Sequence, residues 1–357
     1  MNRSARVTRA SLGPRDEKAE LFSGANGDGR ERMLRMTSFS QIKMFARWLR
    51  PCWATGAAFA WLLALMAEMQ AQDFTYASAD GTITITGYTG PGGNVTIPGT
   101  IAGLPVTSIS DNAFRGVTVL TGVTIPDSVT NLGEQAFFGC SSLASLSIGN
   151  GITMIRGGAE NGLGLGGTFQ NCTSLTRVMI PDSVTNIGDG TETIGGPAGA
   201  FFYCTSLTNV TVGRGLTYLG LGAFSWCTNL AGVYFRGNAP TPGQSPGFGE
   251  ELFYGTLVIA YYMPGTTGWG PTFSTTHTAL WNPQAQTSDG NFGVRQSRFG
   301  FNISGTADIP LVVEATTNVA AQSWLPLQSC TLTNGLIYFS DAEWMNYPSR
   351  VYRIRSP

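Results

Sequence analysis

The sequence predicts a mainly β protein with short helical turns, in which a stack of short repeats is followed by a small β module. Three observations predict this class. A unit recurs, since LTGVTIPDSVTNLG at residues 120–133 returns as LTRVMIPDSVTNIG at residues 175–188. Glycine is plentiful, at 47 of 357 residues, as a chain with many turns requires. After residue 291 the repeat stops, and apolar and polar residues alternate as in strands.

The period of the repeat points to a solenoid. An element V-T-x-I, with close variants, recurs in steps of 23, 23, 32 and 32 residues, ending at Ile109, Leu132, Ile155, Ile187 and Leu219. The nine extra residues of the longer steps fall at one place, in Gly-rich insertions after Ile155 and Ile187. Stacked coils must keep their core positions in register, whereas one loop of each coil is free to grow into solvent.

Each coil carries the same apolar pattern. A segment L-x-x-[VL]-x-[IVF] predicts a short strand that faces inward, as in Leu120/Val123/Ile125, Leu143/Leu146/Ile148, Leu175/Val178/Ile180, Leu207/Val210/Val212 and Leu230/Val233/Phe235. Pro126 and Pro181 end this strand in two coils, because proline cannot donate to a ladder, and Gly149 and Gly213 replace them in others. A stretch A-F-x-x-C, predicted as one helical turn, then supplies a core phenylalanine at Phe114, Phe137, Phe169, Phe201 and Phe224.

The motifs F-x-x-C-[ST]-x-L and I-P-x-S-V-T-x-I-G resemble the hallmark of the BspA-like leucine-rich repeat family of bacterial surface and secreted proteins. The resemblance covers residues 73–283, including residues 261–281, which are similar to the closing segment of such arrays. It implies a right-handed leucine-rich repeat solenoid with caps at both ends, and a role in adhesion and host-protein binding. The nine-residue insertions and the coils without proline depart from the pattern.

The N-terminal region predicts export. In residues 44–72, two arginines precede an apolar run from Ala54 to Met66, and the small residue Ala71 stands before a polar start. We expect a signal peptide cleaved near Ala71, and a secreted or cell-surface chain without a membrane span. A membrane anchor is the alternative, for which the apolar run is short. Residues 1–43 are expected to be a disordered or mis-annotated extension, and Met1, Met36 and Met44 all stay open as start codons.

Residues 291–357 are predicted to form a small β-sandwich-like module, because several short alternating segments fit into fewer than 70 residues. Residues 282–290 are predicted to be a linker. The role of this module is left open.

Charge and chemistry exclude several classes of function. From residue 73 onward the chain has 10 Arg, no Lys and 16 Asp plus Glu, so 10 − 16 = −6, which argues against nucleic acid. After the predicted cleavage site one histidine remains, His277, and Glu250 and Glu251 are adjacent in a loop rather than placed across a cleft. We therefore expect no enzyme, no metal and no cofactor.

Four cysteines occupy the same repeat position: Cys140, Cys172, Cys204 and Cys227. A column of buried thiols is the favoured interpretation, because free cysteine packs well. Disulfides between neighbouring coils stay open, because export permits them and the coil spacing of about 5 Å does not prevent them. Without a C-x-x-C motif, a metal site is the weakest alternative.

Two polar columns are candidates for binding. Thr107, Thr130, Thr153, Thr185 and Thr217 form a threonine column, which we interpret as a hydroxyl ladder that satisfies backbone groups, with ice or carbohydrate binding as the alternative. The candidate partner-binding face consists of the outward strand positions and their neighbours: Thr124, Ser147, Arg177, Met179, Asn209, Thr211, Trp226 and Tyr234.

Our first hypothesis is an exported, adhesin-like protein that binds extracellular protein or glycan, because extended faces of repeat proteins bind partners. A structural envelope or matrix component without a dedicated ligand is the alternative. A polysaccharide-active enzyme is the weakest hypothesis, because no acid/base pair is placed.

Overall fold

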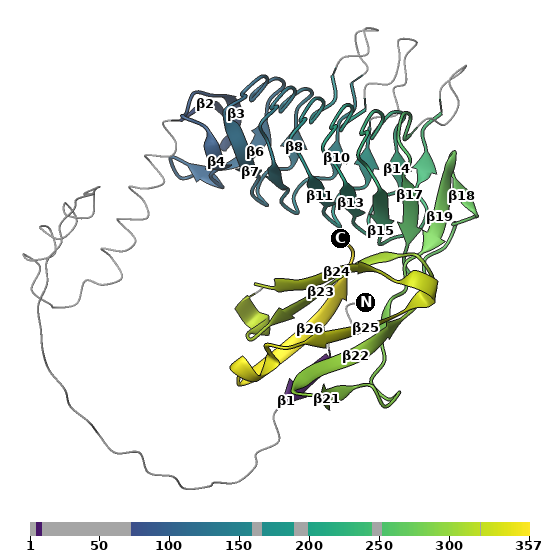
Figure 1. Cartoon of the computed structure of the whole chain (residues 1–357). Helices are drawn as coiled ribbons and strands as arrows, with labels where there is room; N and C mark the ends of the chain where they lie inside the picture. The colour runs from purple at the N-terminus through teal and green to yellow at the C-terminus, as the bar shows by residue number, and fades with distance from the viewer. Residues whose placement is uncertain (1–4, 9–72, 159–165, 189–198, 245–251, 322) are drawn as a thin grey trace, which may run out of the picture. The chain divides into compact units, whose positions relative to one another are not determined.

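The computed structural model describes residues 5–8, 73–158, 166–188, 199–244, 252–321 and 323–357, and these are almost entirely strands and turns (Figure 1). The chain divides into two units, one of which, residues 9–66, lies outside the described residues. The predicted signal peptide and most of the predicted N-terminal extension also lie outside them. The account below concerns the other unit.

An antiparallel hairpin begins the array of repeats. β2 (Phe74–Ala79) pairs with β3 (Thr82–Tyr88), and β3 pairs in parallel with β6 (Leu104–Ile109). The short β5 (Thr100–Ile101) lies antiparallel on β6. Phe74 and Tyr88 of this hairpin contact the ring of Phe114, so the hairpin covers the first end of the core.

Two rows of parallel strands follow (Figure 1); most coils contribute one strand to each row, and the first row extends beyond the second at the C-terminal end of the array. The first row comprises β4 (Gly93–Thr96), β7 (Leu120–Thr124), β9 (Ser145–Ser147), β11 (Arg177–Ile180), β13 (Asn209–Val212), β15 (Gly232–Phe235), β17 (Ile259–Tyr262) and β19 (Thr276–Leu280). The second row comprises β8 (Asn131–Leu132), β10 (Met154–Ile155), β12 (Asn186–Ile187), β14 (Tyr218–Leu219) and β16 (Thr241–Pro242). β18 (Thr272–Phe273) closes the first row as an antiparallel partner of β19.

The repeat units pair in strict register. Val178 lies opposite Val210, which lies opposite Val233, so the inward positions of successive coils are aligned. The same alignment holds in the second row, where Ile155 lies opposite Ile187 and Ile187 opposite Leu219. This explains why the extra nine residues fall between these elements and not within them.

A column of stacked phenylalanines fills the core. The ring centroids of Phe114, Phe137, Phe169, Phe201 and Phe224 follow one another at 4.7, 5.3, 5.2 and 5.3 Å, with interplanar angles of 15° or less. All five side chains are fully buried. The A-F-x-x-C stretch that places them was predicted to be one helical turn, but it is a run of turns closed by local hydrogen bonds such as Cys140 N–H to Phe137 O. It does not continue as a helix because alternate N–H groups, such as those of Phe137 and Gly139, bond to the next coil.

The cysteine column lies beside the phenylalanines. Cys140, Cys172, Cys204 and Cys227 are unbridged and fully buried. Each thiol donates to the phenylalanine carbonyl of the preceding coil, at 3.1 to 3.3 Å. Burial raises the pKa of Cys140 to about 12, and the pKa of Cys172 and of Cys204 well above the ordinary value. These thiols are therefore packed donors and not reactive groups.

Residues 284–357 form two antiparallel sheets together with residues 5–8, a short segment of the predicted N-terminal extension that is a strand here. One contains β20 (Gln284–Ala285), β21 (Gly293–Arg295), β22 (Arg298–Ser304) and β25 (Leu336–Asp341). The other contains β1 (Ala5–Thr8), β26 (Ser349–Arg355), β23 (Pro310–Thr316) and β24 (Leu325–Thr331). Three short 3-10 helices complete this C-terminal module: η1 (Val319–Ala321), η2 (Thr333–Gly335) and η3 (Trp344–Asn346).

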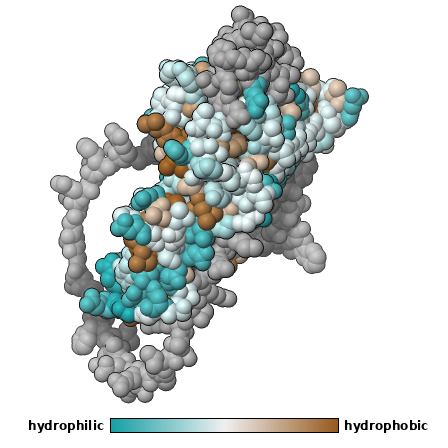
Figure 2. Space-filling model, turned by 90° about the vertical axis from the view of Figure 1, so that its right-hand side faces the viewer, coloured by the Kyte–Doolittle hydropathy of each residue, from teal (hydrophilic) through white to brown (hydrophobic). Residues whose placement is uncertain are grey.

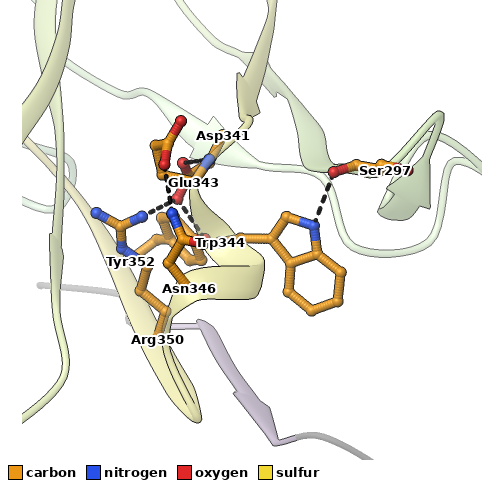
Figure 3. Close-up of polar contacts among 7 residues, drawn as sticks. All are labelled: Ser297, Asp341, Glu343, Trp344, Asn346, Arg350 and Tyr352. Atoms are coloured by element: carbon orange, nitrogen blue, oxygen red, sulfur yellow. Dashed lines mark hydrogen bonds and ion pairs between the residues drawn. The ribbon is translucent and has the colours of Figure 1, made fainter. Parts of the chain in front are cut away.

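Buried ion pairs tie the C-terminal module together. Asp341 accepts hydrogen bonds from Arg350 at 2.5 Å and from the Tyr352 hydroxyl at 2.9 Å, and the arginine and the carboxylate are both about 95% buried (Figure 3). Glu314 of β23, which is equally buried, pairs with Arg353 and Arg355 of β26, whose side chains are partly exposed. A buried carboxylate requires such partners, because its desolvation is otherwise uncompensated.

Candidate partner-binding face

Strand alternation produces one continuous outward face on the first row of strands. In β11 the side chains of Val178 and Ile180 are buried while those of Arg177 and Met179 are exposed. Because strands pair in register, the outward positions of successive coils line up: Thr124 lies opposite Ser147, and Met179 lies opposite Thr211. We call the following residues the strand face: Thr124, Ser147, Arg177, Met179, Asn209 and Thr211.

Most side chains of the strand face are small and polar, and only one of them is charged. Thr124, Ser147 and Arg177 are exposed, and Asn209 and Thr211 are half-buried. Met179 leaves 65% of its surface in solvent. A polar, flat sheet with one apolar and one cationic protrusion can contact a partner, but it contains no carboxylate or imidazole for acid/base chemistry.

Tyr234 was predicted to belong to this face, and the structure shows that it does not. It lies in register with Thr211, as predicted, yet it is only 1% exposed. Its ring stacks on Tyr261 at 4.7 Å and meets Trp281 edge-on at 6.3 Å. Burial and the neighbouring Tyr261 raise the pKa of the Tyr234 hydroxyl, whereas Arg177 acts in the opposite direction.

The closing segment of the array and the C-terminal module cover Tyr234. Both stacked tyrosines belong to the hydrophobic cluster of the C-terminal module, together with Ile309 and Leu311. The Trp281 indole N–H donates to Pro310 O at 2.9 Å, and this hydrogen bond holds Trp281 in place against Tyr234. An outward position in a strand is thus exposed only where no other part of the chain covers it.

Trp226 also lies elsewhere than predicted. It follows the core residue Phe224 in the turn of its coil, with a φ of +60°, and it is not on a strand of the first row. It is 40% exposed and meets Tyr254 edge-on at 5.4 Å. Sequence reasoning missed Tyr203 and Tyr254, which are exposed at the same corner of neighbouring coils. Aligning the coils at their core phenylalanines would have revealed them.

The threonine column is a hydroxyl ladder, as predicted. Thr130 donates to Thr107 O at 3.3 Å, Thr185 to Thr153 O and Thr217 to Thr185 O at 3.1 Å each. Each bond joins one coil to the preceding one. These hydroxyl protons are already used within the stack, which weakens the alternative of an ice- or carbohydrate-binding column.

Other candidate groups do not assemble into a site. His277 is exposed on β19, and Glu250 and Glu251 lie outside the described residues. Within the described ranges, no cluster of three or more His, Cys, Asp and Glu side chains is suited to hold a metal ion. The same part of the chain contains no helix that is long and apolar enough to cross a membrane. On the face drawn in Figure 2, apolar residues form small separate patches.

Aligned parallel strands, one core phenylalanine in each coil and a buried thiol in four of the coils define a leucine-rich repeat protein. The family can be stated more closely. Residues 94–191 and 165–257 match six copies of the BspA type leucine rich repeat region, and the chain belongs to this family.

Several solved structures are similar to this chain. A leucine rich repeat protein of T. pallidum is 30% identical, with a TM-score of 0.36, over 53% of this chain and 85% of that one. One from Bacteroides capillosus is 31% identical, with a TM-score of 0.26, over 31% of this chain and 80% of that one. A leucine rich cell surface protein of Faecalibacterium prausnitzii is 19% identical, with a TM-score of 0.26, over 58% and 75% of the two chains. Among curated proteins, no match is found.

Proposed function

We propose that this chain is an exported, non-enzymatic repeat protein that binds an extracellular protein or glycan through its strand face. In this proposal a signal peptide at residues 44–72 is cleaved near Ala71, so the mature chain lacks β1 and its pairing with β26. The array at residues 73–283 is a right-handed solenoid, and residues 291–357 form a small β-sandwich-like module behind it. No cofactor takes part in binding.

The exposure of Met179 is the observation that carries the proposal. An apolar side chain that is 65% exposed stands at the centre of the first row of strands, between the buried Val178 and Ile180. Arg177 extends from the same face of the same strand. Methionine and arginine are both enriched where proteins contact partners, and a paired strand holds them in a fixed position before binding.

A binding panel tests the proposal. The purified chain is applied to immobilised extracellular glycans and matrix proteins, beside an Arg177→Ala/Met179→Ala variant. We expect saturable binding that weakens by about tenfold or more in the variant, corresponding to about 1.4 kcal/mol or more. Met345→Ala, which removes a methionine that is 58% exposed in the C-terminal module, is the matched control and should bind like the wild type.

Two results would contradict the proposal. A folded protein that binds nothing on a broad panel would favour a structural envelope or matrix component. Binding that is equally strong in the variant would place the contact surface away from the strand face.

A further inference from the structure

One position at the corner of the coils has a left-handed backbone in every coil from Phe114 to Phe253. The residue two after each core phenylalanine has a left-handed backbone in six successive coils, with φ of +69°, +69°, +61°, +62°, +60° and +74° at Gly116, Gly139, Asn171, Tyr203, Trp226 and Gly255. Three coils use glycine there and one uses asparagine, which are the residues that accept this conformation most readily. Two adjacent coils use tyrosine and tryptophan.

The aromatic residues at this position are not required by the fold. A left-handed backbone costs free energy for any residue with a Cβ atom, and it is uncommon for a bulky one. The glycine coils make the same turn, with the same hydrogen bond from this N–H to the next coil: Gly139 donates to Gln170 O, and Trp226 donates to Tyr254 O. Tyr203 and Trp226 leave 46% and 40% of their surface in solvent, so neither ring completes the core.

The rings form a row across three coils. Tyr203 and Trp226 occupy equivalent positions in adjacent coils, and the core rings of these coils, Phe201 and Phe224, are 5.3 Å apart. The indole of Trp226 lies over the next coil, because a Cβ atom added at Gly255 would lie 3.2 Å from it. It meets the ring of Tyr254, which is 49% exposed. We call Tyr203, Trp226 and Tyr254 the aromatic row.

We propose that the aromatic row binds a neutral glycan. Tyr203 and Trp226, at equivalent positions of adjacent coils, offer their ring faces to the apolar C–H faces of successive hexose rings, whereas Tyr254, whose ring lies at 73° to the indole, flanks them with its edge. The phenol hydroxyls and the indole N–H supply polar groups for the sugar hydroxyls. An equatorially linked hexose chain presents such faces along a flat ribbon. Asn171, which precedes Tyr203 in the same column, adds an amide at one end.

Charge and area favour a glycan over other partners. The aromatic row and Asn171 contain no ionised group, whereas nucleic acids and acidic polysaccharides require cations. The exposed parts of the three rings amount to roughly 300 Å², taking about 150–250 Å² for each aromatic side chain. A stable protein partner or a second copy of this chain needs about 800 Å² on each side.

This inference rests on the proposed function in so far as both make the chain a binding protein, but it concerns a different surface. The aromatic row lies at the turns of the coils, whereas the strand face lies on the first row of strands. Variants of the two surfaces therefore separate the two proposals.

Titration calorimetry with the purified full-length chain and cellohexaose or mannohexaose tests the inference. We expect saturable binding of at least one of these neutral hexasaccharides. Tyr203→Asn and Trp226→Asn should each weaken it by about tenfold, which corresponds to about 1.4 kcal/mol. Asparagine is chosen because Asn171 already occupies this position at a φ of +61°. Tyr254→Ala, at a residue without the left-handed backbone, should weaken binding without any question of turn geometry.

Controls separate this site from the others. Arg177→Ala/Met179→Ala should bind the hexasaccharides like the wild type, whatever it does to protein partners. Hexagalacturonate, an anionic chain of equal length, should bind more weakly. The inference is overturned if neither neutral chain binds to the folded wild type, if binding survives in all three aromatic variants, or if the anionic chain alone binds. Self-association that the same variants abolish, without glycan binding, would assign the aromatic row to a second copy of the chain.

Discussion

Replacing Phe137 by alanine should cost about 4–5 kcal/mol of unfolding free energy. Its ring is fully buried and lies between Phe114 at 4.7 Å and Phe169 at 5.3 Å. Truncation of a buried phenylalanine costs about 3–5 kcal/mol, and each stacked pair contributes about 0.5–1.5 kcal/mol beyond its buried area. The loss of two stacked neighbours places Phe137 at the upper end of this range.

The next residue in the chain provides a matched control. Phe138 is half-buried, and its ring contacts the Arg115 guanidinium at 4.5 Å instead of the phenylalanine column. Phe138→Ala should therefore cost only about 1 kcal/mol, the order of an exposed cation–π contact with partial burial. Urea unfolding followed by circular dichroism measures both variants. If Phe137→Ala costs less than about 2 kcal/mol, or no more than Phe138→Ala, the stacked column does not hold the coils together.

Three further predictions concern other parts of the unit. Burial raises the pKa of Cys140 from 9.0 to about 12, so the folded state should lose stability as pH rises through this window, by up to about 1.4 kcal/mol per pH unit. Urea unfolding at pH 8 to 10 should show this dependence, and Cys140→Ser should reduce its slope. Asp341→Asn leaves the Arg350 guanidinium buried without its carboxylate and should cost about 3–5 kcal/mol of unfolding free energy in thermal or urea unfolding. Arg236→Gln breaks an exposed ion pair and should cost less than about 1 kcal/mol. Equal costs would contradict the view that the buried pair stabilises the C-terminal module. Gly149→Ala should cost about 1–3 kcal/mol, because its Cβ would lie 2.5 Å from the carbonyl carbon of Pro126, and an unchanged midpoint of unfolding would refute this close approach.

The close approach at Gly149 explains why some coils end their first strand with glycine instead of proline, which the sequence alone does not explain. Coils that end their strand with proline alternate with coils that use glycine, and the glycine lies against the backbone of the preceding proline. Gly213 repeats the contact on Pro181, with a Cβ distance of 2.4 Å. The side chain of Asp127 then accepts the Asn150 N–H at 2.7 Å, so this corner is closed by the coil before it. A periodic pattern predicts that coils stack, but only the contact between two coils shows why one of them lacks a side chain.

What could be predicted from the sequence follows from periodicity. Core positions recur once in every coil, so the strand registers, the phenylalanine column and the hydroxyl ladder all follow from the spacing of Phe137 and Thr130 and their equivalents. The short turns were predicted as helical because A-F-x-x-C resembles one turn of helix. In the structure their N–H groups bond to the adjacent coil, for example Phe137 to Thr168 O, and this competition between local and stacking hydrogen bonds is not visible in one repeat.

The burial of Tyr234 could not be predicted from the repeat, because it depends on contacts with residues outside the repeat pattern. Tyr234 has the same place in its coil as the exposed Thr211 and Met179, so periodicity alone assigns it to the strand face. Trp281 and the hydrophobic cluster of the C-terminal module cover it. Tyr261 in the next coil is buried in the same cluster, and the pKa of its hydroxyl is raised by this burial and by the nearby Asp308.

This burial limits where a partner can bind. The strand face is accessible at the coils of Thr124, Ser147, Met179 and Thr211, and it ends where Tyr234 begins to be covered. The C-terminal module therefore does more than follow the array: it shields two large aromatic side chains that would otherwise extend the exposed face by an apolar patch. A partner that contacts Met179 meets a surface of bounded length whose far end is the chain's own C-terminal module, and this boundary, rather than the number of repeats, sets the size of the proposed binding site.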